Sequence, residues 1–166
     1  MKTIDYIRMN LETGYSMVAG LLDDMKDAPL TQPTSQGGNH PLWILGHLAY
    51  SEANILHNIM QGNENPLADW SDMFAGGTEP VADADRYVSW DEAWQKFQDI
   101  RKESLAYLDT LTDADLDQPS KNCTPGRESF FGTIGQCFNV MALHPTMHYG
   151  QIADARRAAG RARLFV

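Results

Sequence analysis

Apolar residues recur every three or four positions at the beginning of the chain. The repeating positions are Ile4, Ile7, Leu11, Tyr15, Val18, Leu21, Leu22 and Met25. This spacing places them on one face of a helix and predicts a helix over residues 3–26. The helix has to end before Pro29, because proline cannot continue it.

The same period returns after residue 89. Ser89 and Glu92 have the spacing of a capping box, which marks the start of a helix. The apolar positions that follow are Trp90, Ala93, Trp94, Phe97, Ile100, Tyr107, Leu108 and Leu111. They predict a helix that ends near Leu111.

Two further helices are predicted from their end signals. One begins near Asn39–Pro41, since Asn is a good N-cap and proline is tolerated in a first turn. Gly62 is expected to end it. The last helix is predicted from Phe130 or Thr133 to Gly160.

The connections between these helices decide the fold class. Residues 29–39 and 63–89 hold prolines, glycines and polar residues, which is typical of loops, although "LADWSDMF" favours a short helical turn. No alternating strand pattern occurs. The sequence therefore predicts an all-α fold with one domain over residues 1–166. We expect a four-helix bundle whose long 63–89 connection allows the second and third helices to run parallel.

Composition and charge narrow the classes of partner. The chain has 13 Lys and Arg against 22 Asp and Glu, a net charge of −9, and 43% of its residues are hydrophobic. Such a surface repels nucleic acid and anionic lipid. No apolar run is long enough to span a bilayer, and the N-terminus lacks the apolar core of a signal peptide. We expect a cytoplasmic protein whose two cysteines, Cys123 and Cys137, are reduced thiols.

His144 and His148 stand four residues apart in the last predicted helix. This spacing puts both imidazoles on one face with Cβ atoms ~5–6 Å apart, close enough to chelate one ion. The rest of that face consists of Ile134, Cys137, Met141, Ile152, Ala155 and Ala159. The pair therefore points inward, where uncompensated imidazoles are costly. By themselves the two residues are either metal ligands or hydrogen-bonded core histidines.

His47 is the third candidate ligand. It is the only strongly polar residue of "PLWILGHLAY", a segment that is buried around most of its circumference. A polar group there needs a partner. On a helical wheel His47 lies about 130° from the stripe of Leu45, Leu48, Ile55 and Ile59, so it must face a different neighbour from that stripe.

Two further polar residues are candidates for supporting roles. Glu52 falls on the apolar stripe of its helix, where it either orients an imidazole or acts as a base, or else forms an ion pair inside the bundle. Gln151, three residues beyond His148, is a candidate for holding that imidazole in place. The acidic 63–89 segment either covers the site or is a plain solvated crossover.

The other potential ligands are placed less favourably. His40 and Cys137 each lie seven residues from a candidate histidine, ~10.5 Å along a helix axis, and His57 lies further away at another azimuth. We expect all three to be structural or exposed. Pro145 stands between the paired histidines, where it removes one backbone hydrogen bond and favours a bend.

Two segments of the chain resemble a known family. "WILGHLAYSE" and "HPTMHYGQIADARRAAG" are similar to motifs of the DinB-like metal-binding four-helix bundles, which include the YfiT-like group named as metal-dependent hydrolases. The resemblance covers nearly the whole chain, and Pro145 departs from the family pattern. It implies an up-down-down-up bundle, often dimeric, whose divalent ion is held by His47, His144 and His148.

The resemblance also implies a class of chemistry. Better-understood relatives are thiol-dependent S-transferases or isomerases, in which the ion binds the thiolate of a low-molecular-weight thiol. Three imidazoles with an open position suit zinc or nickel. We therefore expect a metal-dependent enzyme, a hydrolase or a thiol-dependent transferase acting on a small molecule, with Glu52 or Gln151 in support. The alternative is a metal-binding or structural helical bundle without turnover.

Overall fold

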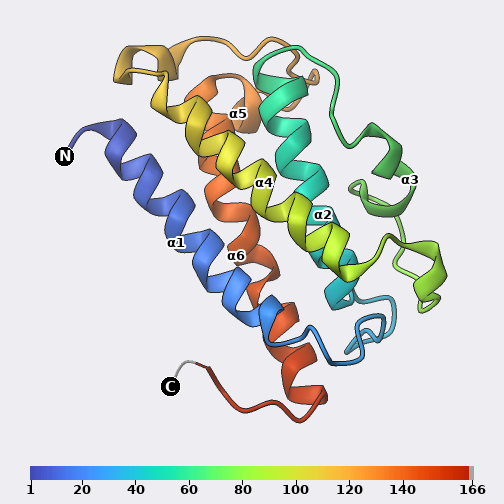
Figure 1. The fold of residues 1–166 in the computed structure, drawn as a ribbon. Helices are drawn as coiled ribbons and strands as arrows, with labels where there is room; N and C mark the ends of the chain where they lie inside the picture. Colours follow the sequence, from blue (N-terminus) through green and yellow to red (C-terminus); the bar gives the residue numbers. More distant parts are fainter. Residues whose placement is uncertain (165–166) are drawn as a thin grey trace.

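The computed structural model describes residues 1–164, and its architecture is helical (Figure 1). The long helices are α1 (Thr3–Asp23), α2 (Pro41–Ala53), α4 (Trp90–Asp109) and α6 (Ile134–Ala158). The short ones are η2 (Ala68–Trp70), α3 (Ser71–Phe74), η3 (Ala84–Arg86), η4 (Asp113–Asp117) and α5 (Glu128–Phe131). A π-helix, η1 (Asn54–Met60), continues α2. Within residues 1–164 there is no strand, so the predicted all-α class is confirmed.

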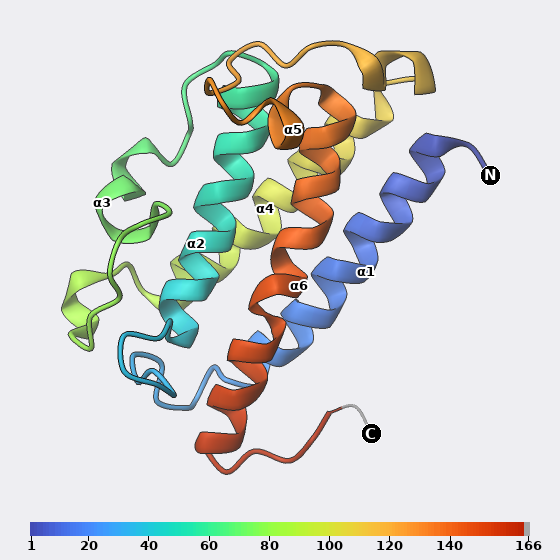
Figure 2. The same ribbon diagram turned by 180° about the vertical axis from the view of Figure 1, so that it is seen from behind.

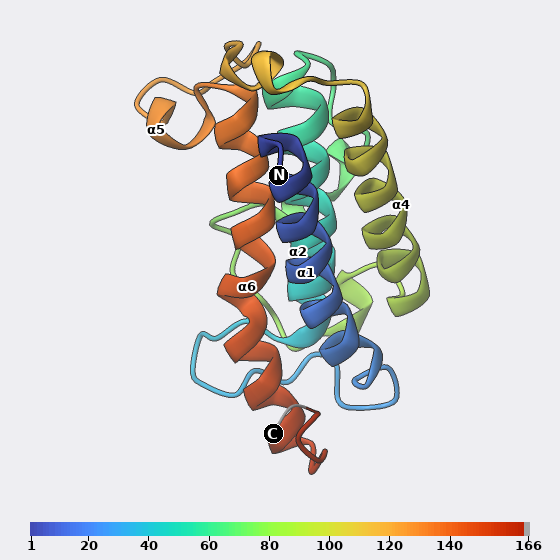
Figure 3. The same ribbon diagram turned by 90° about the vertical axis from the view of Figure 1, so that its left-hand side faces the viewer.

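The four long helices lie side by side. In Figure 1, α1 and α6 run from the top of the view towards the bottom, whereas α2 and α4 run upward. Figure 3 places α1 in front of α2, with α6 and α4 on either side. Helix α6 packs on α1 and α2, and α2 packs on α4. This arrangement brings the middle of α2 against the middle of α6, which is where the candidate histidines lie.

The helix ends follow the expected capping rules with one exception. Ser89 Oγ accepts a hydrogen bond from Glu92 N at 3.2 Å, and Thr133 forms a reciprocal capping box with Gln136. Gly62 adopts φ +74° after η1, a left-handed conformation that suits glycine. Helix α2, however, is capped by His40, whose Nδ1 accepts from Trp43 N at 3.1 Å. The expected cap, Asn39, lies one residue earlier.

Close packing fixes the long connection against α2. A Cβ atom added at Gly46 would lie 2.3 Å from the ring of Phe74, so only glycine lets α3 approach this closely. Phe74 is fully buried at that contact. The "LADWSDMF" segment is helical as η2 and α3, as predicted. Because His47 follows Gly46 in α2, this contact brings the end of α3 close to His47.

Helix α6 continues through Pro145. His144 and His148 therefore keep their helical relation, and both remain on the face that meets α2. The described part of the chain contains no helix that combines the length and apolar character needed to cross a membrane.

Candidate metal centre

The three histidines converge between α2 and α6. His47 Nε2 lies 3.1 Å from His144 Nε2, and His148 Nε2 lies 3.2 Å from the same atom. One ligand atom from each residue lies within 4.8 Å of the others, so the three could hold one metal ion. In Figure 2, α2 and α6 lie next to each other on the side of the molecule that faces the viewer. Because these nitrogens come from residues about 100 positions apart, the fold itself assembles the cluster.

The backbone and an aromatic ring hold His47 in place. His47 Nδ1 donates to the carbonyl oxygen of Phe74 at 2.7 Å, and this leaves Nε2 as the lone-pair nitrogen. The Trp43 ring stacks on the imidazole with centroids 4.4 Å apart and an interplanar angle of 10°. Trp43 is anchored in turn, since its Nε1 donates to Thr78 Oγ1 at 3.0 Å. The 63–89 connection therefore orients the imidazole.

Gln151 holds His148 in the same way. His148 Nδ1 donates to Gln151 Oε1 at 2.8 Å, which again leaves Nε2 with its lone pair. Asn39 Nδ2 donates to the same oxygen at 3.3 Å and so fixes the orientation of the amide. Gln151 thus has the contact expected of a residue that orients a ligand.

Burial keeps the cluster neutral. Burial, with a smaller contribution from the neighbouring imidazoles, lowers the pKa of His47 to about 4 and the pKa of His144 to about 3. Burial also lowers the pKa of His148, which its hydrogen bond to Gln151 partly offsets. Three neutral imidazoles at neutral pH are the form that binds a metal ion.

The hydrogen bonds within the cluster cannot all be satisfied. His47 and His148 present lone pairs, and His144 has one N–H to donate, which reaches at most one of them. At least one buried nitrogen is therefore left facing another without a proton between them, and this is costly. With the proton of His144 on Nδ1, all three Nε2 atoms present lone pairs, and a single cation would satisfy them. The donor set therefore fits a divalent ion of the zinc or nickel type.

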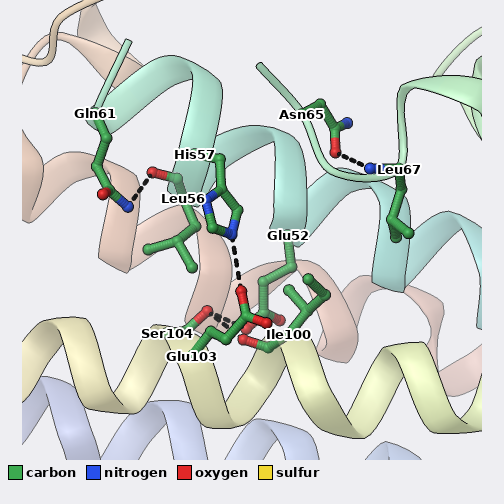
Figure 4. A network of polar contacts seen from close by, with 9 residues as sticks. All are labelled: Glu52, Leu56, His57, Gln61, Asn65, Leu67, Ile100, Glu103 and Ser104. Carbon is green, nitrogen blue, oxygen red and sulfur yellow. Dashed lines mark hydrogen bonds and ion pairs between the residues drawn. The ribbon is translucent and has the colours of Figure 1, made fainter. Parts of the chain in front are cut away.

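Glu52 belongs to a different cluster on another face of α2. Its Oε2 accepts from Arg101 at 2.7 Å and its Oε1 accepts from Ser104 at 2.7 Å. Figure 4 shows the carboxylate reaching Ser104 on α4. Burial raises the pKa of Glu52, and Arg101 and Ser104 counteract that effect. Of the roles left open by the sequence, this geometry is that of the internal ion pair, because both oxygens accept from side chains of α4.

The remaining candidate ligands serve structural roles. His40 is buried as the cap of α2, and its Nε2 donates to the carbonyl oxygen of Val81 at 3.0 Å. His57 pairs with Glu103 on α4 at 2.9 Å (Figure 4). Both cysteines are free, and burial raises the pKa of Cys137 to about 12. His40, His57 and Cys137 are thus outside the three-histidine cluster.

A pocket of ≈ 580 Å³ opens beside the histidines. His47 and His144 line it together with residues of η1, of the segment 124–131 and of α6. Three large apolar side chains of its lining are exposed, namely Phe130, Leu143 and Met147. A small molecule in this pocket would have direct access to the imidazoles.

Sequence reasoning missed several residues that shape the site. The acceptor for His47 is the Phe74 backbone, and a carbonyl leaves no sequence signal. The partners of Glu52 were detectable, since Phe97, Arg101, Ser104 and Leu108 share one face of α4 by their spacing of four, three and four residues. A cation on an apolar face indicates a buried acid on the neighbouring helix.

Comparison with known proteins assigns the chain to a family. A search of curated proteins finds no match. The family model of the DinB superfamily matches residues 10–152, which include most of α1, all of α2 and α4, and the histidines of α6. This match covers far more than half of the chain. The chain therefore belongs to the DinB superfamily.

Proposed function

We propose that this protein is a metal-dependent enzyme of the hydrolase or thiol-dependent S-transferase type, with a divalent ion held by His47, His144 and His148. One observation carries the proposal. Three neutral imidazoles present their Nε2 atoms to a common point, and hydrogen bonds to Phe74 and Gln151 fix the orientation of two of them. Superfamily membership is compatible with metal binding.

The chemistry follows from the donor set. A zinc or nickel ion held by His47, His144 and His148 would lower the pKa of water or bind a thiolate. The protein's own residues do the rest. Phe74 and Gln151 orient the imidazoles, and burial keeps them unprotonated. The pocket beside His47 and His144 admits a small molecule.

A second reading is a metal-binding bundle without turnover. It is favoured by the absence of a candidate base close to the histidines in the described part of the chain, since Glu52 is committed to Arg101. The substrate pocket is the feature that favours an enzyme, because a purely structural metal site is closed on all sides.

Metal analysis of protein purified without an affinity tag tests the first step. We expect about one ion per chain in the native protein, and none in His148→Ala. Gln151→Leu should bind the ion about tenfold more weakly, because it loses the orienting hydrogen bond but no ligand. His57→Ala is the matched control, since His57 pairs with Glu103 away from the cluster. Native protein that takes up no ion would contradict the proposal.

Activity distinguishes the two readings. The metal-loaded protein should be assayed on panels of esters, amides, and thiols combined with electrophiles. Turnover that disappears in His148→Ala and persists in His57→Ala supports the enzyme. A loaded protein that turns over none of them supports the binding bundle instead.

Three further features belong to this proposal. We propose that the four long helices form the up-down-down-up bundle implied by the family resemblance. The protein would act as a cytoplasmic homodimer on a small molecule rather than on nucleic acid. Sedimentation at several concentrations would test the dimer.

A further inference from the structure

The pocket beside the histidines has an apolar body. Ile55 and Ile59 enter from η1, Phe131 from α5, and Val140 from α6. A π-helix is wider than an α-helix and frequently occurs at a functional site. Here η1 supplies two of the apolar side chains, together with Asn54. Such a lining suits a ligand with a hydrocarbon portion.

The charge of the pocket is opposite to that of the protein. The chain carries a net charge of −9, yet no Asp or Glu is found among the described residues lining the pocket. Its only side chain with a permanent charge is Arg127. Within residues 1–164 the Arg127 guanidinium has no ion-pair or hydrogen-bond partner. The adjacent Glu128 forms no ion pair with it, and its Oε1 accepts instead from Gly126 N at 3.0 Å.

The segment that carries Arg127 is held against η1. Asn122 N donates to the carbonyl oxygen of Ile59 at 3.0 Å, and Asn122 Nδ2 donates to Asn58 Oδ1 at 2.6 Å. Phe131 N donates to the Arg127 carbonyl oxygen at 3.0 Å, at the start of α5. These bonds fix the backbone around the guanidinium, which reduces the entropy lost when it binds a ligand.

We propose that this pocket binds a small organic carboxylate, with the carboxylate on Arg127 and the hydrocarbon portion on Ile55, Ile59 and Val140. A planar guanidinium matches the two oxygens of a carboxylate, and one cation balances one negative charge. The amides of Asn54 and Asn139, which also line the pocket, add hydrogen-bonding capacity. This inference deepens the proposed function, because it assigns a substrate class to the same site.

Two probes that differ in a single functional group test the proposal. Isothermal titration at low salt compares 4-phenylbutanoate with 4-phenylbutan-1-ol, which replaces the carboxylate by a neutral alcohol. The full-length protein is treated with chelator and dialysed, so that the carboxylate cannot bind an ion. We expect the acid to bind about fivefold more tightly than the alcohol, as suits one partly solvated ion pair. Arg127→Gln should abolish that preference and leave alcohol binding unchanged.

Matched variants separate a local effect from a global one. Arg157→Gln removes an exposed arginine of the last turn of α6, outside the pocket, and should keep the preference. Arg127→Lys should keep part of it. Equal binding of the two probes, a preference that survives in Arg127→Gln, or no saturable binding of either probe would overturn the proposal. Because the titration uses metal-free protein, its outcome does not depend on whether the protein binds a metal ion.

Discussion

Helix α2 carries two buried polar residues, His47 and Glu52, that meet opposite surroundings. Glu52 faces α4, where Arg101 and Ser104 occupy both of its oxygens. His47 faces α6, where its Nε2 meets His144 Nε2 at 3.1 Å. The first residue is 6% exposed and the second 7%, so burial does not distinguish them.

The difference lies in whether the protein supplies the partner. Within residues 1–164, both carboxylate oxygens of Glu52 accept hydrogen bonds, and Arg101 supplies the opposite charge, although Arg101 Nε has no hydrogen-bond partner. The three-histidine cluster has three nitrogens that face one another with too few protons between them. Buried polar groups left without partners destabilise a protein. We therefore expect the three-histidine cluster to take up a cation, whereas the negative charge of Glu52 is already balanced by Arg101 within the fold.

Breaking the ion pair between Glu52 and Arg101 should cause the largest loss of stability. Glu52→Ala leaves the Arg101 guanidinium buried at 3% exposure without its counter-charge. We expect the free energy of unfolding in urea to fall by about 3–5 kcal/mol, as for other buried pairs broken on one side. Metal affinity should stay unchanged, because Glu52 does not contact the histidines.

Two controls test this interpretation. Glu103→Ala removes the 49% exposed carboxylate that pairs with His57, and it should cost less than about 0.5 kcal/mol. The double variant Glu52→Leu/Arg101→Leu removes both buried charges and should recover most of the lost stability. Equal losses of stability for Glu52→Ala and Glu103→Ala would contradict the distinction between the buried and the exposed ion pair. A weakened metal affinity of Glu52→Ala would contradict the separation of Glu52 from the histidines.

The three-histidine cluster should instead make the stability of the metal-free protein depend on pH. In the unfolded chain a histidine titrates near 6.5, whereas burial lowers the pKa of His47 to about 4. The unfolded state therefore binds more protons between these values, and the metal-free protein loses stability as the pH falls from 6.5 through 4. We expect His47 alone to contribute about 2 kcal/mol of that loss by about pH 4.5.

Urea unfolding of chelator-treated protein at several pH values measures this loss. In His47→Leu the stability should fall less steeply over the same range, because one titrating group is gone. Above pH 6.5 the two proteins should have parallel pH profiles. A wild-type stability that stays constant down to pH 4 would show that the cluster is not held neutral by burial.

Much of the fold could be predicted from local sequence signals. The stripe of residues 4–25 predicted α1, and the caps at Ser89 and Thr133 lie where helices α4 and α6 begin. Helix α2 starts within the predicted range, at Pro41, but its cap is His40 and not Asn39, because a histidine ring nitrogen also accepts a hydrogen bond. The π-helical form of η1 was not predicted, since the apolar positions of residues 54–60 gave no signal that distinguishes it from an α-helix.

The site could be predicted only in part. The spacing of His144 and His148 shows that they share a face, and the wheel shows that His47 avoids the stripe that contains Glu52. Neither gives the distance between α2 and α6, which depends on how the side chains of both helices pack. The role of Phe74 depends on a backbone carbonyl, and Arg127 lines the pocket only because segment 120–132 folds back onto η1.

Two serines provide the finest test of the comparison between the clusters. Ser104 donates to Glu52 at 2.7 Å and is fully buried, so Ser104→Ala should cost about 1–2 kcal/mol in urea unfolding. Ser51 Oγ lies 3.4 Å from His47 Nδ1, whose proton already goes to Phe74 at 2.7 Å. Ser51→Ala should therefore change stability and metal affinity by less than about 0.5 kcal/mol. A large effect of Ser51→Ala on metal affinity would mean that the hydroxyl, and not the Phe74 carbonyl, orients His47.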